Sequence, residues 1–272
     1  MSLSKLYLRH LRKPHKIAQR LCSIAANNRT TYFISSGLVS LPSVRGFATG
    51  NPPLSPRPND FNHQIESLSK NRDWKGVLHV LDTMSAKGVI PSVKMYNIAI
   101  STCGKNDRWE EAVQLKNGML SKGVVPDIVT YTTLISACGN KGELRQALAL
   151  FAEMQDKGIS PDTQCYTSVI SACGKDGQWK KAIELLREMG DKGITPDSYC
   201  YNAAISACGS RGQWQKALEL LREMEGKGIA PTAVSYNAAI SACGKGSQWQ
   251  TAVELLREME GRGIVPDIYS YN

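Results

Sequence analysis

The sequence predicts an all-α fold, an α-solenoid in which helix-turn-helix units stack into a right-handed superhelix. A tyrosine, a proline and a methionine each recur every 35 residues along most of the chain. A fixed period of this length is typical of a supersecondary unit that buries its apolar face only against its neighbours. The recurring residues are Tyr96, Tyr131, Tyr166, Tyr201, Tyr236 and Tyr271; Pro91, Pro126, Pro161, Pro196, Pro231 and Pro266; Met84, Met119, Met154, Met189, Met224 and Met259.

The unit at residues 198–232 predicts a first helix that begins near its tyrosine. Apolar residues at i, i+3, i+4 and i+7 form one stripe at the helical period. The stripe consists of Tyr201, Ala204, Ile205 and Cys208. Because glycine tolerates positive φ, Gly209 is the expected C-terminal end of this helix.

A second helix is expected from about Gln213 in the same unit. Its inner face carries Trp214, Ala217, Leu218, Leu221 and Met224. The segment Lys227–Ile229 offers a basic last turn, a glycine for the left-handed cap and an apolar residue that can fold back. Pro231 cannot continue the helix. Each unit is therefore expected to contain two antiparallel helices.

The repeats define the expected domain organisation. Six full units fill residues 58–267, and residues 268–272 begin a truncated seventh. A linker with three prolines precedes them at residues 48–57 and is expected to be extended. The six units are 58–92, 93–127, 128–162, 163–197, 198–232 and 233–267.

Residues 1–47 have the composition of an organellar targeting presequence. They contain eight basic residues and no acid, and a processing-type sequence ends at Phe47. Mitochondrial localisation is the expectation, with the plastid as the alternative. This segment accounts for eight of the 33 basic residues, so 25 remain against 24 acids. Bulk charge in the repeats is therefore weak evidence for a nucleic-acid partner.

Two sets of polar residues recur in phase with the units. Asn or Thr always follows the recurring aromatic residue, and the proline is followed by Asp, Ser or Thr. A short polar side chain before a helix is typical of an N-cap. From spacing alone, capping is the favoured interpretation of the second set, and the role of the Asn/Thr set stays open.

The repeated pattern PD-x-x-x-YN-x-x-I-S-A-C-G-K…W-x-x-A-x-E-L-L-R-E-M-x-x-K-G-I resembles the pentatricopeptide repeat family of the plain 35-residue type. The resemblance covers residues 58–267. Such repeats bind single-stranded RNA, one base per repeat through two or three side chains. In this family the residue after the tyrosine and the residue after the next proline select the base, so one Asp would both cap and select.

The resemblance implies twelve base-selecting residues and one preferred sequence. From the first unit to the sixth, 5′ to 3′, that sequence is C, U, G, G, C, U. The pairs are Asn62 with Ser92, Asn97 with Asp127, Thr132 with Asp162, Thr167 with Asp197, Asn202 with Thr232, and Asn237 with Asp267.

The resemblance also implies residues that flank bases and contact phosphates. The base-flanking candidates lie three positions before each Asn or Thr, and the phosphate candidates close the first helix. They are Val129, Tyr199 and Val234 for bases, and Lys70, Lys105, Lys175 and Lys245 for phosphates. A cation at a helix C-terminus is an equally good interpretation of each lysine alone.

Other repeated residues are interpreted as core. Five cysteines recur once per unit in the first apolar stripe, without a Cys-x-x-Cys motif, so reduced buried thiols are favoured over a metal site or disulfides. The tryptophans open the second helix in phase with its stripe, which favours packing over base stacking. No catalytic constellation is found in the sequence, and no cofactor or metal is expected.

The leading functional hypothesis is sequence-selective binding of single-stranded organellar RNA without catalysis by the chain itself, in support of RNA processing, stability or translation. RNA-processing proteins are possible partners, and no membrane insertion is expected. One alternative is a helical scaffold that binds a protein. Another is the RNA-binding fragment of a larger RNA-processing enzyme.

Overall fold

The computed structural model describes residues 58–271, and the expected presequence and linker therefore lie outside the described residues. This part of the chain contains twelve α-helices of 13 residues each and no strand. The helices are α2 (Pro58–Lys70), α3 (Trp74–Ala86), α4 (Val93–Lys105), α5 (Trp109–Ser121), α6 (Ile128–Asn140), α7 (Leu144–Asp156), α8 (Thr163–Lys175), α9 (Trp179–Asp191), α10 (Ser198–Ser210), α11 (Trp214–Gly226), α12 (Ala233–Lys245) and α13 (Trp249–Gly261).

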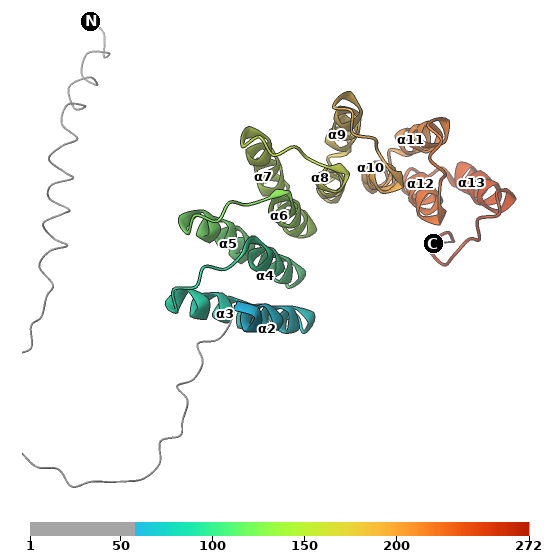
Figure 1. Ribbon diagram of the computed structural model, residues 1–272. Coiled ribbons are helices and arrows are strands. Elements are labelled where there is room, and N and C mark those ends of the chain that lie inside the picture. Colours follow the sequence, from blue (N-terminus) through green and yellow to red (C-terminus); the bar gives the residue numbers. More distant parts are fainter. Residues whose placement is uncertain (1–57, 272) are drawn as a thin grey trace, which may run out of the picture. The chain divides into compact units, whose positions relative to one another are not determined.

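The helices pack as successive pairs, which confirms the all-α solenoid. Each even-numbered helix, the first of its pair, contacts the first helix of the next pair, so α4, α6, α8, α10 and α12 form a continuous row. Each odd-numbered helix contacts its own partner, and α3, α5, α7, α9 and α11 also contact the following first helix. In Figure 1 the first helices line the inner side of the curve and the second helices its outer side.

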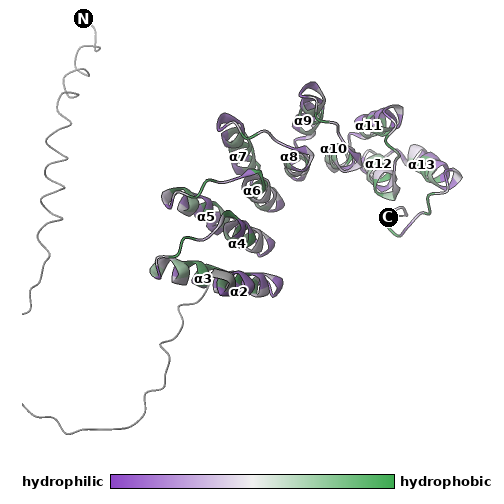
Figure 2. Ribbon diagram, in the orientation of Figure 1, coloured by the Kyte–Doolittle hydropathy of each residue, from purple (hydrophilic) through white to green (hydrophobic). Residues whose placement is uncertain are grey.

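The core runs along the junction between the two rows. Five repeat tyrosines are at most 2% exposed, and each unit adds methionine, leucine or isoleucine side chains from both helices. Hydrophobic and hydrophilic residues alternate along the helices in Figure 2, as expected for amphipathic helices that pack on one side. The seven cysteines in the described residues are free and buried.

The predicted role of Gly209 as a helix end is wrong. Gly209 lies inside α10, and the left-handed residue that follows this helix is Gly212, with φ +65°. A Cβ on Gly209 would lie 3.3 Å from the Cβ of Ala242 in α12. The same glycine in earlier units lies against the next first helix even more tightly, with a built Cβ 2.6 Å from Ala172 at Gly139. The glycine thus permits close helix approach.

Four of the five tryptophans pack against the core as predicted, and one is exposed. Trp74, Trp109, Trp179 and Trp214 are partly buried against the core, whereas Trp249 is 69% exposed. Trp214 lies directly against Gly246 in the turn of the next unit. The residue that corresponds to Gly246 one unit later would be number 281, so Trp249 has no such contact within the 272 residues.

Hydrogen bonds join the tyrosine of each first helix to a carboxylate on the second. Tyr131 donates to Glu153 over 3.0 Å, and Lys157 donates to both groups over 3.0 and 2.7 Å. Burial raises the pKa of Glu153, but hydrogen bonds from Lys116, Lys157 and Tyr131 outweigh it and bring the pKa to about 2. Tyr166, Tyr201 and Tyr236 likewise donate to a glutamate 22 residues later.

Tyr96 is the exception to this pattern. The residue 22 positions later is Gly118 instead of a glutamate, and Tyr96 Oη is buried without a hydrogen-bond partner among the described residues. Lys122 lies over the Tyr96 ring, where the corresponding lysine of other units also binds the glutamate.

Within residues 58–271 no helix has the length and apolar character to cross a membrane, and no group of metal-ligating side chains was found.

Replacement of Gly139 by alanine is expected to destabilise the solenoid by about 1–3 kcal/mol, because the added methyl group would overlap Ala172 across two packed helices. Thermal unfolding followed by circular dichroism measures this change. Gly244→Ala is the matched control: a Cβ at this equivalent position meets nothing within 4 Å. Better helix propensity should make that variant about 1 kcal/mol more stable. Equal shifts in the two variants would contradict the packing role.

Gly118→Glu is expected to stabilise the protein more than Gly118→Ala. Both variants remove a helical glycine, worth about 1 kcal/mol, and a side chain at this position has free space. Only glutamate can accept the hydrogen bond from Tyr96, which should add about 1 kcal/mol. Comparison of the two melting temperatures separates the effects, and identical values would show that the tyrosine gains no partner.

Candidate nucleic-acid interface

The structure places the base-selecting candidates on the first helices and at their N-caps. Ser92, Asp127, Asp162 and Asp197 each accept a hydrogen bond from the backbone N–H three residues later. Thr232 forms a reciprocal capping box with Ser235. The capping interpretation of these residues is therefore confirmed, and in the Asp residues one carboxylate oxygen remains available beside the cap.

Two of the expected pairs are joined directly. Asn97 Nδ2 donates to Asp127 Oδ1 over 3.1 Å, and Asn237 Nδ2 donates to Asp267 Oδ1 over 2.9 Å. Each bond joins the first helix of a unit to the last residue of the same unit. In both pairs an amide hydrogen and the second carboxylate oxygen remain for a ligand, so a donor and an acceptor lie side by side.

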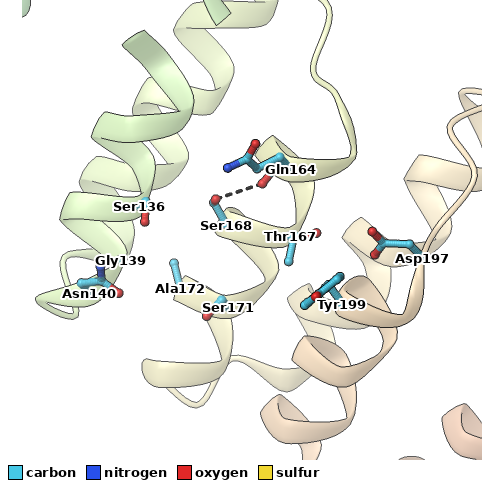
Figure 3. A pocket seen from close by; sticks show the side chains of 10 residues that line it. All are labelled: Ser136, Gly139, Asn140, Gln164, Thr167, Ser168, Ser171, Ala172, Asp197 and Tyr199. Carbon is cyan, nitrogen blue, oxygen red and sulfur yellow. Dashed lines mark hydrogen bonds between the residues drawn. The ribbon is translucent and has the colours of Figure 1, made fainter. Parts of the chain in front are cut away.

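The other four pairs have no direct hydrogen bond within residues 58–271. Thr167 and Asp197 line one cleft, which Figure 3 shows with side chains from α6, α8 and the start of α10. Thr132 differs from Thr167, because it is only 8% exposed and its Oγ1 is buried without a hydrogen-bond partner among the described residues.

A further set of side chains contacts the Asn and Thr candidates from the following unit. Thr130 donates to Asn97 Oδ1, Ser235 to Asn202 Oδ1 and Ser270 to Asn237 Oδ1, each over 2.6 Å. Cys200 Sγ lies 3.0 Å from Thr167 Oγ1. The sequence analysis assigned these residues no role. The sequence contains a signal that could have identified them. A hydroxyl residue lies 33 positions after Asn97, Asn202 and Asn237, and a cysteine lies 33 positions after Thr132 and Thr167.

The Asp127 carboxylate stays ionised at neutral pH. Burial raises its pKa, but hydrogen bonds from the Thr130 backbone, the Thr130 hydroxyl and the Asn97 amide together lower it below the ordinary value of 3.8. The pKa of Asp267 is also lowered by hydrogen bonds, from Asn237, Tyr269 and Ser270, against an opposing effect of burial. Both sites therefore present a negative acceptor.

The base-flanking candidates are prominent on the surface of the first helices. Val129, Tyr199 and Val234 are 53%, 72% and 60% exposed. Val129 lines a cleft together with Asn97 and Asp127, and Tyr199 lines the cleft of Thr167. Val129 and Tyr199 therefore sit beside selecting residues of the preceding unit.

Charge is divided between the two rows of helices. Helices α4, α6, α8, α10 and α12 contain four lysines and no acidic residue, whereas each second helix carries at least one carboxylate. The phosphate candidates Lys70, Lys105, Lys175 and Lys245 are exposed at first-helix ends. Lys175 donates to Asn140 in the preceding first helix over 2.6 Å.

Three family models match the chain. A model described as the PPR repeat family matches residues 91–140, 126–175 and 231–272. A pentatricopeptide repeat domain model matches residues 54–106 and 184–246, and a PPR repeat model matches residues 164–194. Together the matches extend over residues 54–272. No curated protein matches the chain.

Solved structures share the fold. The pentatricopeptide repeat protein PPR10 in complex with an 18-nt psaJ RNA element has a TM-score of 0.58 at 21% identity, over 80% of this chain and 37% of that one. The PPR domain of Arabidopsis thaliana protein-only RNase P 1 in complex with tRNA has a TM-score of 0.54 at 17% identity, over 63% and 91%. Arabidopsis thaliana nuclear protein-only RNase P 2 has a TM-score of 0.52 at 20% identity, over 62% and 38%.

The period, the helix pairs and the family models agree. Every described unit carries the same two helices, and the matched segments cover all of them. This chain belongs to the pentatricopeptide repeat family.

Proposed function

We propose that this protein binds single-stranded RNA with sequence selectivity in an organelle, and that it acts by binding and not by chemistry of its own. Bound RNA would be protected, remodelled or presented to processing enzymes. The composition of residues 1–47 supports mitochondrial import, with the plastid as the alternative. The RNA in the PPR10 and RNase P 1 complexes supports RNA as the ligand class.

The observation that carries the proposal is the paired donor and acceptor at the joints between units. Asn97 with Asp127, and Asn237 with Asp267, each leave one amide hydrogen and one carboxylate oxygen for a ligand. The Watson–Crick edge of uracil offers an N–H beside a carbonyl oxygen and is complementary to this arrangement. Single-stranded RNA exposes such edges, whereas a duplex does not.

The shape and charge of the first-helix row support the same ligand. Val129, Tyr199 and Val234 expose apolar or aromatic surface beside the selecting residues, which suits contact with base faces. Helices α4, α6, α8, α10 and α12 contain no acidic side chain, so no carboxylate within these helices repels a phosphate backbone that approaches their lysines.

The units with threonine are assigned to purines. A threonine side chain is shorter than asparagine and leaves room for a larger base, and the following Asp can accept hydrogen bonds from the amino and imino groups of guanine. With the order of units from 5′ to 3′, the preferred sequence is CUGGCU. The adjacent guanines at the units of Thr132 and Thr167 are its most distinctive feature.

The double variant Thr132→Asn/Thr167→Asn is expected to shift the preference of the full chain from CUGGCU towards CUUUCU. Each selected base should contribute about 1–3 kcal/mol by analogy with paired base contacts in DNA grooves. Fluorescence anisotropy with labelled oligoribonucleotides measures the four dissociation constants at one fixed salt concentration.

Thr83→Asn/Thr251→Asn is the matched control, because it makes the same chemical change on the second helices α3 and α13. The control should keep the wild-type preference. If wild type and double variant bind both RNAs with equal affinity, these side chains do not select bases. Binding of a protein ligand would then become the better hypothesis.

A further inference from the structure

We infer that a hydroxyl residue immediately before a repeat tyrosine is a positioning residue for the base-selecting Asn of the preceding unit. A hydroxyl at this position orients an Asn, and a thiol accompanies a Thr. The inference rests on the proposed function, since it concerns how the proposed base-selecting side chains are held. It adds a third residue to the pairs of Asn97, Asn202 and Asn237.

The three Asn contacts have the same geometry. Thr130, Ser235 and Ser270 each donate to the amide oxygen of an Asn 33 residues earlier, and each donor–acceptor distance is 2.6 Å. A hydroxyl has one proton, and the amide oxygen is the acceptor nearest to the hydroxyl oxygen in all three cases. All three hydroxyl residues are buried, which shields the bond from competing water.

This bond fixes which end of the amide faces a ligand. With Oδ1 held by Thr130, Asn97 Nδ2 gives one hydrogen to Asp127 and keeps the other. The reversed amide would place Oδ1 against a carboxylate oxygen and Nδ2 against a hydroxyl that already accepts from the Asp127 N–H. The Asn is therefore preorganised as a hydrogen-bond donor, and its oxygen is withdrawn from competition.

The dependence on the hydroxyl is greatest at Asn202. The residue paired with it is Thr232, so no carboxylate is available to attract its Nδ2 group. Ser235 is the one hydrogen-bond partner that the structure shows for the Asn202 side chain among the described residues. The orientation of this amide thus depends on a side chain of the next unit.

The Thr units use a different partner. Thr167 Oγ1 donates to the backbone carbonyl of Thr163 over 2.8 Å and lies 3.0 Å from Cys200 Sγ. Cys200 Sγ also lies 4.0 Å from the same Thr163 carbonyl oxygen, so the thiol and the Thr167 hydroxyl share one backbone acceptor. Burial raises the pKa of Cys200, as it raises that of Cys165 to about 11, so both stay protonated at pH 7.

The pairing follows the identity of the selecting residue through the chain. Asn97, Asn202 and Asn237 are followed 33 residues later by Thr or Ser, and Thr132 and Thr167 by Cys. The first unit departs from this rule, because Met95 follows Asn62 and has no hydroxyl. Its Asn62 amide is expected to be the least well oriented of the four, and base selection in that unit the weakest.

The experiment installs the proposed pair in a unit that lacks it. Thr167→Asn creates an Asn opposite Cys200, and Thr167→Asn/Cys200→Ser supplies the hydroxyl as well. Anisotropy titrations of the full chain compare CUGGCU with CUGUCU, which differ at the base assigned to this unit. We expect the double variant to prefer uracil over guanine about fivefold more strongly than the single variant, the effect of one net hydrogen bond.

Two matched variants test whether the hydroxyl acts through this Asn. Cys200→Ser alone should retain the guanine preference of the wild type, because no amide is present to orient. Thr167→Asn/Cys165→Ser places the same hydroxyl one unit earlier, where it faces Thr132 instead, and should behave like Thr167→Asn alone. A hydroxyl at position 200 can also cap α10 and raise the melting temperature, but capping alone does not change a ratio of base affinities.

The outcomes distinguish the positioning role of the hydroxyl from the proposed base selection. If Thr167→Asn moves the preference towards uracil and Cys200→Ser adds nothing, the positioning role is overturned while base selection stands. If Cys165→Ser helps as much as Cys200→Ser, the effect is general and the positioning role is likewise overturned. If none of these proteins distinguishes the two RNAs, the proposed function fails, and the inference that rests on it fails with it.

Discussion

The close approach of consecutive first helices is the constraint on which the rest of the structure depends. Glycines at 104, 139, 174 and 209 lie against alanines of the next first helix, and each contact spans 33 residues. The contact between Asn97 and Thr130 also spans 33 residues and begins seven residues, or two helical turns, before Gly104. The interface that stacks the units therefore also brings the polar side chains together across their joints.

This constraint explains why polar and charged groups are divided between the rows. A first helix that touches its neighbours on both sides has little room for long charged side chains, and α6 and α10 contain none. Most ion pairs lie on the second helices and at their C-caps, although Lys94 of α4 pairs with Glu66 of α2. The tyrosines connect the rows through Glu153 and its equivalents.

The sequence predicted the features that depend on one unit and missed those that depend on two. Helical period, core stripe and N-caps are local, and the 35-residue repetition made them unambiguous. Gly209 was misassigned because a glycine near a helix end normally indicates positive φ, while its actual role is decided by Ala242. Trp249 repeats the residues of the other units but lacks their contact, so its exposure differs although its local sequence does not.

The hydroxyl contacts also depend on residues of two units, so a candidate base-selecting site is not contained within one unit. The tyrosine-to-proline pattern divides the chain into 35-residue structural units, but Asn97, Asp127 and Thr130 come from both sides of such a boundary. An exchange of the whole unit 93–127 would keep Asn97 with Asp127 but separate it from Thr130. If the proposed base selection holds, we expect the preference of the Asn97 unit to move within the solenoid only when the residues at n, n+30 and n+33 are moved together, because Asn97 is hydrogen-bonded to the other two.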